Sequence, residues 1–107
     1  RPTSGLSEKD IERIIGEAAE AMREDESRHE LANMKNRADG LIYTTERSLN
    51  EFLHYLTDDE RRLIHDDLEN CRRARSGNDM SAIITAIKNL EKSSYRIAEL
   101  MYRDAGG

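Results

Sequence analysis

Hydrophobic positions along residues 31–56 recur at alternating steps of three and four, with Thr45 bridging the widest gap. This period places them on one stripe of an α-helix. The stripe consists of Leu31, Met34, Ala38, Leu41, Ile42, Leu49, Phe52, Leu53 and Leu56. No proline interrupts it, so the pattern predicts a helix over about 26–55, roughly 45 Å long at ~1.5 Å per residue. A compact domain of this size needs a shorter helix, so we expect part of the stripe to lack a partner within the chain.

A shorter helix is predicted ahead of it, over about 8–23. Ser7 can accept a hydrogen bond from the backbone N–H of Asp10, which occupies the acidic position of a capping box. The apolar stripe of this helix is Ile11, Ile14, Ile15, Ala18, Ala19 and Met22. The acidic run at residues 24–26 interrupts the periodicity, and we expect the chain to bend there.

Two more helices are predicted, over about 58–76 and 79–104. Thr57 and Glu60 form a capping box before the first of them, and Gly77 can take a left-handed conformation after it. The connections are short, so the neighbours are antiparallel. We therefore predict an all-α fold in which a protruding N-terminal helix and a long helix lead into an antiparallel three-helix bundle. The bundle uses about residues 45–56 of the long helix; residues 1–7 are a linker, residues 8–104 the helical part and residues 105–107 a tail.

The composition restricts the classes of partner that the chain is expected to bind. The chain has 107 residues, which suits one domain, and 17 Lys and Arg against 22 Asp and Glu give a net charge of −5. Nucleic acid is not expected as a partner, because phosphate binding needs concentrated positive charge. No apolar run reaches the ~20 residues of a membrane span, so no membrane partner is expected. The single Cys71 excludes an internal disulfide, suits a reducing compartment and falls on a predicted buried stripe.

Candidate chemistry is sparse. Two Glu-x-x-His pairs, Glu26 with His29 and Glu51 with His54, each place a carboxylate and an imidazole on one helix face. Both lie on the same predicted helix, 51 − 26 = 25 residues and thus about 37 Å apart, so they cannot share a metal pair. No glycine-rich phosphate loop or nucleophile motif is present. We expect no catalytic, cofactor-binding or metal site and no enzymatic activity in this segment.

Two stretches resemble a known family. Residues 4–11 (Ser-Gly-Leu-Ser-Glu-Lys-Asp-Ile) resemble the entry to the C-terminal helical lid of the seventy-kilodalton heat-shock chaperones, the DnaK family. Residues 36–49, with their Asn-x-Ala-Asp-x-Leu-Ile-Tyr-x-Thr-Glu run, resemble helix B of that lid. The resemblance extends from Ser4 to about Tyr102. It departs from the family after Leu49, where no proline precedes the next helix, and residues 86–89 leave a specialised iron–sulfur-assembly paralogue open.

The resemblance implies a function. In the family a nucleotide-binding domain, which holds ATP, and a β-sandwich with a peptide groove precede the lid. The lid closes over unfolded client peptide in the sandwich and slows its release. The first helix packs on the sandwich, so its docking or self-association face comprises Ile11, Ile14, Ile15 and Met22. The partners implied are thus the β-sandwich of the same parent chain and the client peptide.

The resemblance also assigns roles on the long helix. Asp39 matches the carboxylate that latches the closed lid to a basic residue of a groove loop, and Lys35 and Tyr43 join that contact. Residues Asn36, Arg37 and Ala38 match the place where helix B bends. Without the resemblance, Asp39 would read as an ordinary solvated acid.

Two alternatives to a lid stay open. One is a free-standing helical protein-interaction module, and the other is a bundle metalloprotein. Under either the lid or the module interpretation, the isolated chain is expected to form a homodimer through its uncovered stripe. The expected location is the cytoplasm of a bacterium or the mitochondrial matrix.

Overall fold

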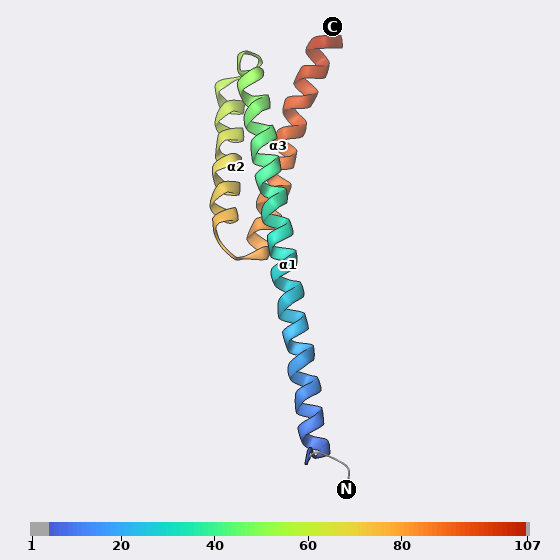
Figure 1. Cartoon of the computed structure of the whole chain (residues 1–107). Coiled ribbons are helices and arrows are strands. Elements are labelled where there is room, and N and C mark those ends of the chain that lie inside the picture. Colours follow the sequence, from blue (N-terminus) through green and yellow to red (C-terminus); the bar gives the residue numbers. More distant parts are fainter. Residues whose placement is uncertain (1–4, 107) are drawn as a thin grey trace. The chain divides into compact units, whose positions relative to one another are not determined.

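The computed structural model describes residues 5–106, and the side chains of residues 5–103. It contains three α-helices, α1 (Glu8–Glu51), α2 (Asp58–Ser76) and α3 (Met80–Gly106), with a short 3-10 helix η1 (Leu53–Tyr55) after α1 (Figure 1). No strand occurs among the described residues, and the predicted all-α class is confirmed. The chain divides into two units, Arg1–Ala32 and Asn33–Gly107.

In the first unit, the helix begins at the predicted capping box. The Ser7 hydroxyl accepts from the Asp10 backbone N–H, and the Asp10 carboxylate accepts from the Ser7 N–H, both at 3.2 Å. The expected end of the first helix near residues 23–26 is wrong, because α1 continues through them. The acidic run is compatible with a helix: no glycine or proline lies there, and Arg28 pairs with Asp25 at 3.2 Å one turn on. One helix therefore replaces the two expected over 8–23 and 26–55.

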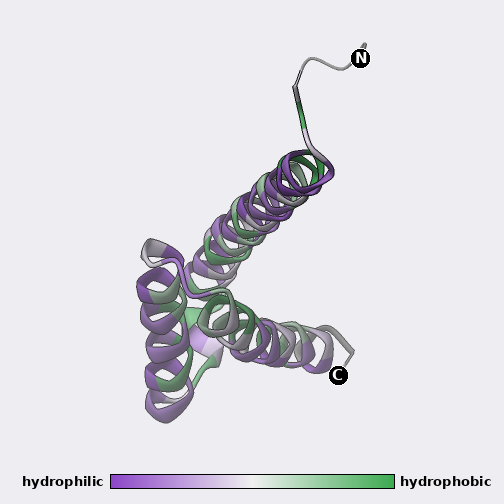
Figure 2. Ribbon diagram, turned by 90° about the horizontal axis from the view of Figure 1, so that it is seen from below, coloured by the Kyte–Doolittle hydropathy of each residue, from purple (hydrophilic) through white to green (hydrophobic). Residues whose placement is uncertain are grey.

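The second unit is the predicted three-helix bundle. Asp39 of α1 pairs with Arg75 of α2, whereas the later Glu46 pairs with the earlier Arg72, so α1 and α2 run antiparallel. Figure 2 shows α2 with hydrophilic residues on its outer side and hydrophobic ones toward the other helices. The buried apolar residues of this unit are Ala38, Ile42, Leu56, Ile64, Leu68, Cys71, Ile83, Ala86, Ile87, Leu90 and Ile97.

The bundle takes in more of the long helix than the expected residues 45–56, since Ala38 and Ile42 are already buried. The reason is the length of α2. It has 19 residues and runs antiparallel to α1, so its last turn lies beside the earlier part of the bundle's share of α1. The Arg75–Asp39 ion pair shows that α2 reaches back along α1 to about residue 39. The predicted lid-latch segment, which spans Lys35, Asp39 and Tyr43, therefore belongs to the bundle.

The helix ends differ from expectation in two details. The long helix stops at Glu51 rather than near residue 55, and the Arg61 guanidinium donates two hydrogen bonds, at 3.0 and 2.7 Å, to the carbonyl of Leu53 in η1. Gly77 is extended (φ −96°, ψ −172°) and not left-handed, and Asp79 caps the next helix two residues later by accepting from the Ala82 N–H. The Thr57–Glu60 capping box is confirmed.

The ends of the chain complete the description. Residues 1–4 of the expected linker and Gly107 of the expected tail lie outside the described residues, while α3 runs through Gly106. None of the helices among the described residues combines the length and apolar content that a membrane crossing requires.

Candidate lid-latch site

Asp39 is held by an arginine of its own chain. The Nε of Arg75 donates to Oδ1 of Asp39 at 2.7 Å, and one terminal nitrogen donates to Oδ2 at 3.0 Å. Arg75 lies in the last turn of α2, and the two side chains remain 38% and 49% exposed. The hydrogen bonds from Arg75, aided by its charge, lower the pKa of the Asp39 carboxyl, and the pKa of Arg75 is raised in turn. The predicted latch carboxylate is thus a bidentate ion pair within the bundle.

Two further contacts join the same stretch of α1 to the bundle. Lys35 donates to the side-chain oxygen of Asn78, between α2 and α3, at 2.9 Å. Arg37 pairs with Glu91 of α3, also at 2.9 Å. Together with Asp39–Arg75, these contacts fasten residues 35–39 to one end of α2 and to the first half of α3.

The remaining predicted residues are placed as follows. Tyr43 is exposed, with the Arg47 guanidinium carbon 6.0 Å from its ring centroid, a cation–π distance. The expected bend residues Asn36, Arg37 and Ala38 are all helical in this structure, and Ala38 is fully buried. The structure therefore brings Lys35 and Asp39 to the bundle and leaves Tyr43 facing solvent.

Sequence reasoning missed the partners Arg75, Asn78 and Glu91. Arg75 lies in the last turn of α2, where the helix dipole favours positive charge in any helix, so its position alone does not identify it as a partner of Asp39. No residue type or spacing points to Arg75 as this partner, because the contact depends on the register of α2 along α1.

The predicted docking face lies on the first unit. Ile11, Ile14, Ile15 and Met22 are between 46% and 65% exposed in this chain. They recur at helical spacing, so they share one face of α1. A contiguous exposed apolar stripe of this kind marks an interaction surface more often than scattered apolar residues do.

Comparison with known proteins adds the family. The family model described as Hsp70 protein matches residues 1–103, which is nearly the whole chain. The chain belongs to the Hsp70 family. A chaperone-related role follows from this membership.

Cys71 and the two Glu-x-x-His pairs are the remaining side chains to place in this Hsp70 chain. Cys71 is buried, and burial raises the pKa of its thiol, with the nearby Asp39 charge acting in the same direction. A raised pKa leaves little of the thiolate that reacts. Among the described residues, no group of three or more His, Cys, Asp or Glu side chains is placed to hold a metal ion.

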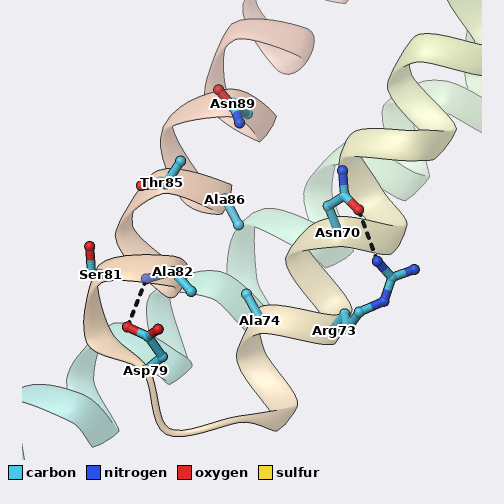
Figure 3. A pocket seen from close by; sticks show the side chains of 9 residues that line it. All are labelled: Asn70, Arg73, Ala74, Asp79, Ser81, Ala82, Thr85, Ala86 and Asn89. Carbon is cyan, nitrogen blue, oxygen red and sulfur yellow. Dashed lines mark hydrogen bonds between the residues drawn. The ribbon is translucent and has the colours of Figure 1, made fainter.

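An open groove runs between α2 and α3 of the Hsp70 chain (Figure 3). Ala74, Ala82 and Ala86 lie along it, and two of its hydrogen bonds are local: Arg73 donates to Asn70 at 3.3 Å, and Asp79 accepts from the Ala82 N–H at 3.2 Å. None of the predicted functional residues lines this groove. The latch segment and the docking face are therefore the candidate functional sites.

Proposed function

We propose that this chain is the lid of an Hsp70 chaperone, which closes over unfolded client peptide held in a separate β-sandwich and slows its release. The observation that carries the proposal is the exposed stripe of Ile11, Ile14, Ile15 and Met22. Burying one large aliphatic side chain is worth about 1.5–3 kcal/mol, so a surface that covers the stripe gains several times that. In the lid interpretation this surface belongs to the β-sandwich of the parent chain.

The latch segment supports the same function. Asp39 is charged and half exposed, and Tyr43 beside it is exposed, so both can meet a basic residue of a groove loop. An exposed ion pair contributes about 0–1 kcal/mol. That is enough to bias a lid toward closure while still letting it open. In this proposal, a nucleotide-binding domain elsewhere in the parent chain binds ATP. The parent protein works in the cytoplasm of a bacterium or in the mitochondrial matrix.

The test measures the release of a fluorescent peptide from the full-length protein that carries this segment. Replacing Asp39→Asn is expected to speed release by up to about fivefold, the equivalent of one exposed ion pair. Asp25→Asn is the matched control, because Asp25 pairs with Arg28 of its own helix, and we expect it to leave the rate unchanged. The lid role is contradicted if release is unaffected both by Asp39→Asn and by the double change Ile14→Ser with Ile15→Ser.

The same exposed stripe also favours a second candidate, a helical interaction module that pairs with a helix of another protein or with a second copy. Sedimentation of the 107-residue chain separates this from the lid. A dimer that Ile15→Ser abolishes, together with unchanged peptide release in the full-length protein, would establish the module instead.

A further inference from the structure

Arg75 and the proposed latch require the same carboxylate. The guanidinium of Arg75 meets both oxygens of Asp39, at 2.7 and 3.0 Å, in the planar fork geometry typical of arginine–carboxylate pairs. This arrangement fills the two lone-pair positions that a second forked or bridging cation would use. A basic residue from outside the bundle therefore cannot take the same edge of Asp39 while Arg75 holds it.

The packing of the bundle places Arg75 next to Asp39. Antiparallel packing puts the last turn of α2 beside residues 35–39 of α1, and the Lys35–Asn78 and Arg37–Glu91 contacts flank the pair on that stretch. The Arg75 side chain is 38% exposed and that of Asp39 49%. Water reaches both groups, so the pair can open without exposing a buried charge.

We propose that Arg75 is an intramolecular competitor of the lid latch, holding Asp39 in the unlatched lid and releasing it when the lid closes. The inference rests on the proposed function. Closure then exchanges one ion pair for another, so its net gain is smaller than that of a latch formed from a free carboxylate. Arg75 thereby weakens the latch and keeps client release fast.

The first experiment tests the pair in the 107-residue chain. The side-chain carboxyl carbon of Asp39 is followed by NMR while the pH is lowered, in the unaltered chain, in Arg75→Gln and in Arg73→Gln. Arg73 is the matched control, because it lies in the same last turn and donates to Asn70 of its own helix. We expect the Asp39 pKa to rise in Arg75→Gln and to stay unchanged in Arg73→Gln. Equal Asp39 titrations in all three would overturn the proposal, whatever the chain's function.

The second experiment measures peptide release from the full-length protein. Arg75→Gln is expected to slow release, by at most about fivefold, because it frees Asp39 for the latch. The double variant Arg75→Gln with Asp39→Asn should release peptide at the rate of Asp39→Asn alone. Urea unfolding of each variant shows whether the bundle remains folded, and Arg75→Lys, which keeps the charge and loses the fork, should slow release less than Arg75→Gln.

The outcomes separate the two ideas. If Asp39→Asn speeds release while Arg75→Gln leaves it unchanged or also speeds it, the latch stands and the competition is overturned. An Arg75→Gln effect of equal size with and without Asp39 also overturns the competition, because Arg75 then acts through the bundle. If Asp39→Asn has no effect on release, the latch itself fails, and the competition fails with it.

Discussion

Ile15, on the first part of α1, exposes 63% of its surface, whereas Ile42, on the second part, exposes 8%. Both are isoleucines on the same helix, at positions of the same apolar periodicity. The difference lies in their surroundings: Ile42 belongs to the unit Asn33–Gly107, where it is part of the buried core, and Ile15 belongs to Arg1–Ala32. An apolar stripe read from the sequence therefore indicates a surface that can be buried, and not one that this chain buries.

The two parts of α1 are consequently stabilised in different ways. Before Asn33 the helix has local support: the Ser7–Asp10 capping box and ion pairs one turn apart, such as Arg23–Glu20 and Arg28–Asp25. Each such pair contributes only about 0.2–0.5 kcal/mol. After Asn33, packing supplies most of the stability, as it does for helices in general. We therefore expect the first part to open at lower urea than the bundle does.

The largest test of this difference compares core and stripe substitutions. Leu90→Ala in the bundle should lower the free energy of unfolding by about 2–5 kcal/mol, because Leu90 is fully buried and its removal leaves a cavity. Ile15→Ala should change it by less than about 0.5 kcal/mol, as exposed positions do. Urea unfolding followed by the NMR signals of bundle residues measures both. If Ile15→Ala lowers the free energy of unfolding as much as a core substitution does, the first part of α1 is covered in solution, by a second copy or by the bundle.

The sequence was sufficient for the parts of the fold that depend on local chemistry. Helix periodicity and the two capping boxes, at Ser7 and Thr57, placed the starts of α1 and α2. It failed at residues 23–26, where the loss of apolar periodicity predicted the end of one helix and the start of another. Glutamate is a good helix former and no glycine or proline lies in this run, so an interrupted stripe can end burial without ending the helix.

The candidate site was less accessible from the sequence. The resemblance drew attention to Asp39, Lys35 and Tyr43, but their partners within the chain are set by how far α2 reaches along α1. That distance depends on where the helix actually turns, at Glu51 rather than at residue 55. A shift of four residues is about one helical turn, which is enough to change which α2 side chain faces Asp39. Tertiary register, and not residue type, decided the contact.

Replacing a glycine by alanine should have different, smaller effects in the two parts of α1. Gly40 and Gly16 both lie inside α1, and a methyl group added at either would meet no atom within 4 Å. Gly40→Ala should raise the free energy of unfolding of the bundle by about 0.5–1 kcal/mol, because alanine loses less backbone entropy in a helix. Gly16→Ala should instead slow amide hydrogen exchange around residues 12–20 and leave the urea midpoint of the bundle unchanged. A raised bundle midpoint for Gly16→Ala would mean that α1 unfolds as one unit.

The smallest expected effect is a loss of bundle stability at acid pH. The backbone N–H of Thr57 donates to the Glu60 carboxylate at 2.9 Å, and this hydrogen bond, helped by the Thr57 hydroxyl and Arg96, lowers the pKa of Glu60. A carboxyl whose pKa is lower in the folded state stabilises the fold above its unfolded pKa of about 4.3. That contribution is lost as the pH falls through the lower folded value.

Glu60→Gln isolates this contribution, because a glutamine oxygen still accepts the capping hydrogen bond and does not titrate. We expect the urea midpoint of the unaltered bundle to fall more steeply below about pH 4.3 than that of Glu60→Gln. Glu24→Gln, in the first unit, is the control and should follow the unaltered chain. An acid dependence that Glu24→Gln reduces as much as Glu60→Gln would show that carboxylates of both units stabilise one cooperative structure, and the contrast between the two parts of α1 would then lose its energetic basis.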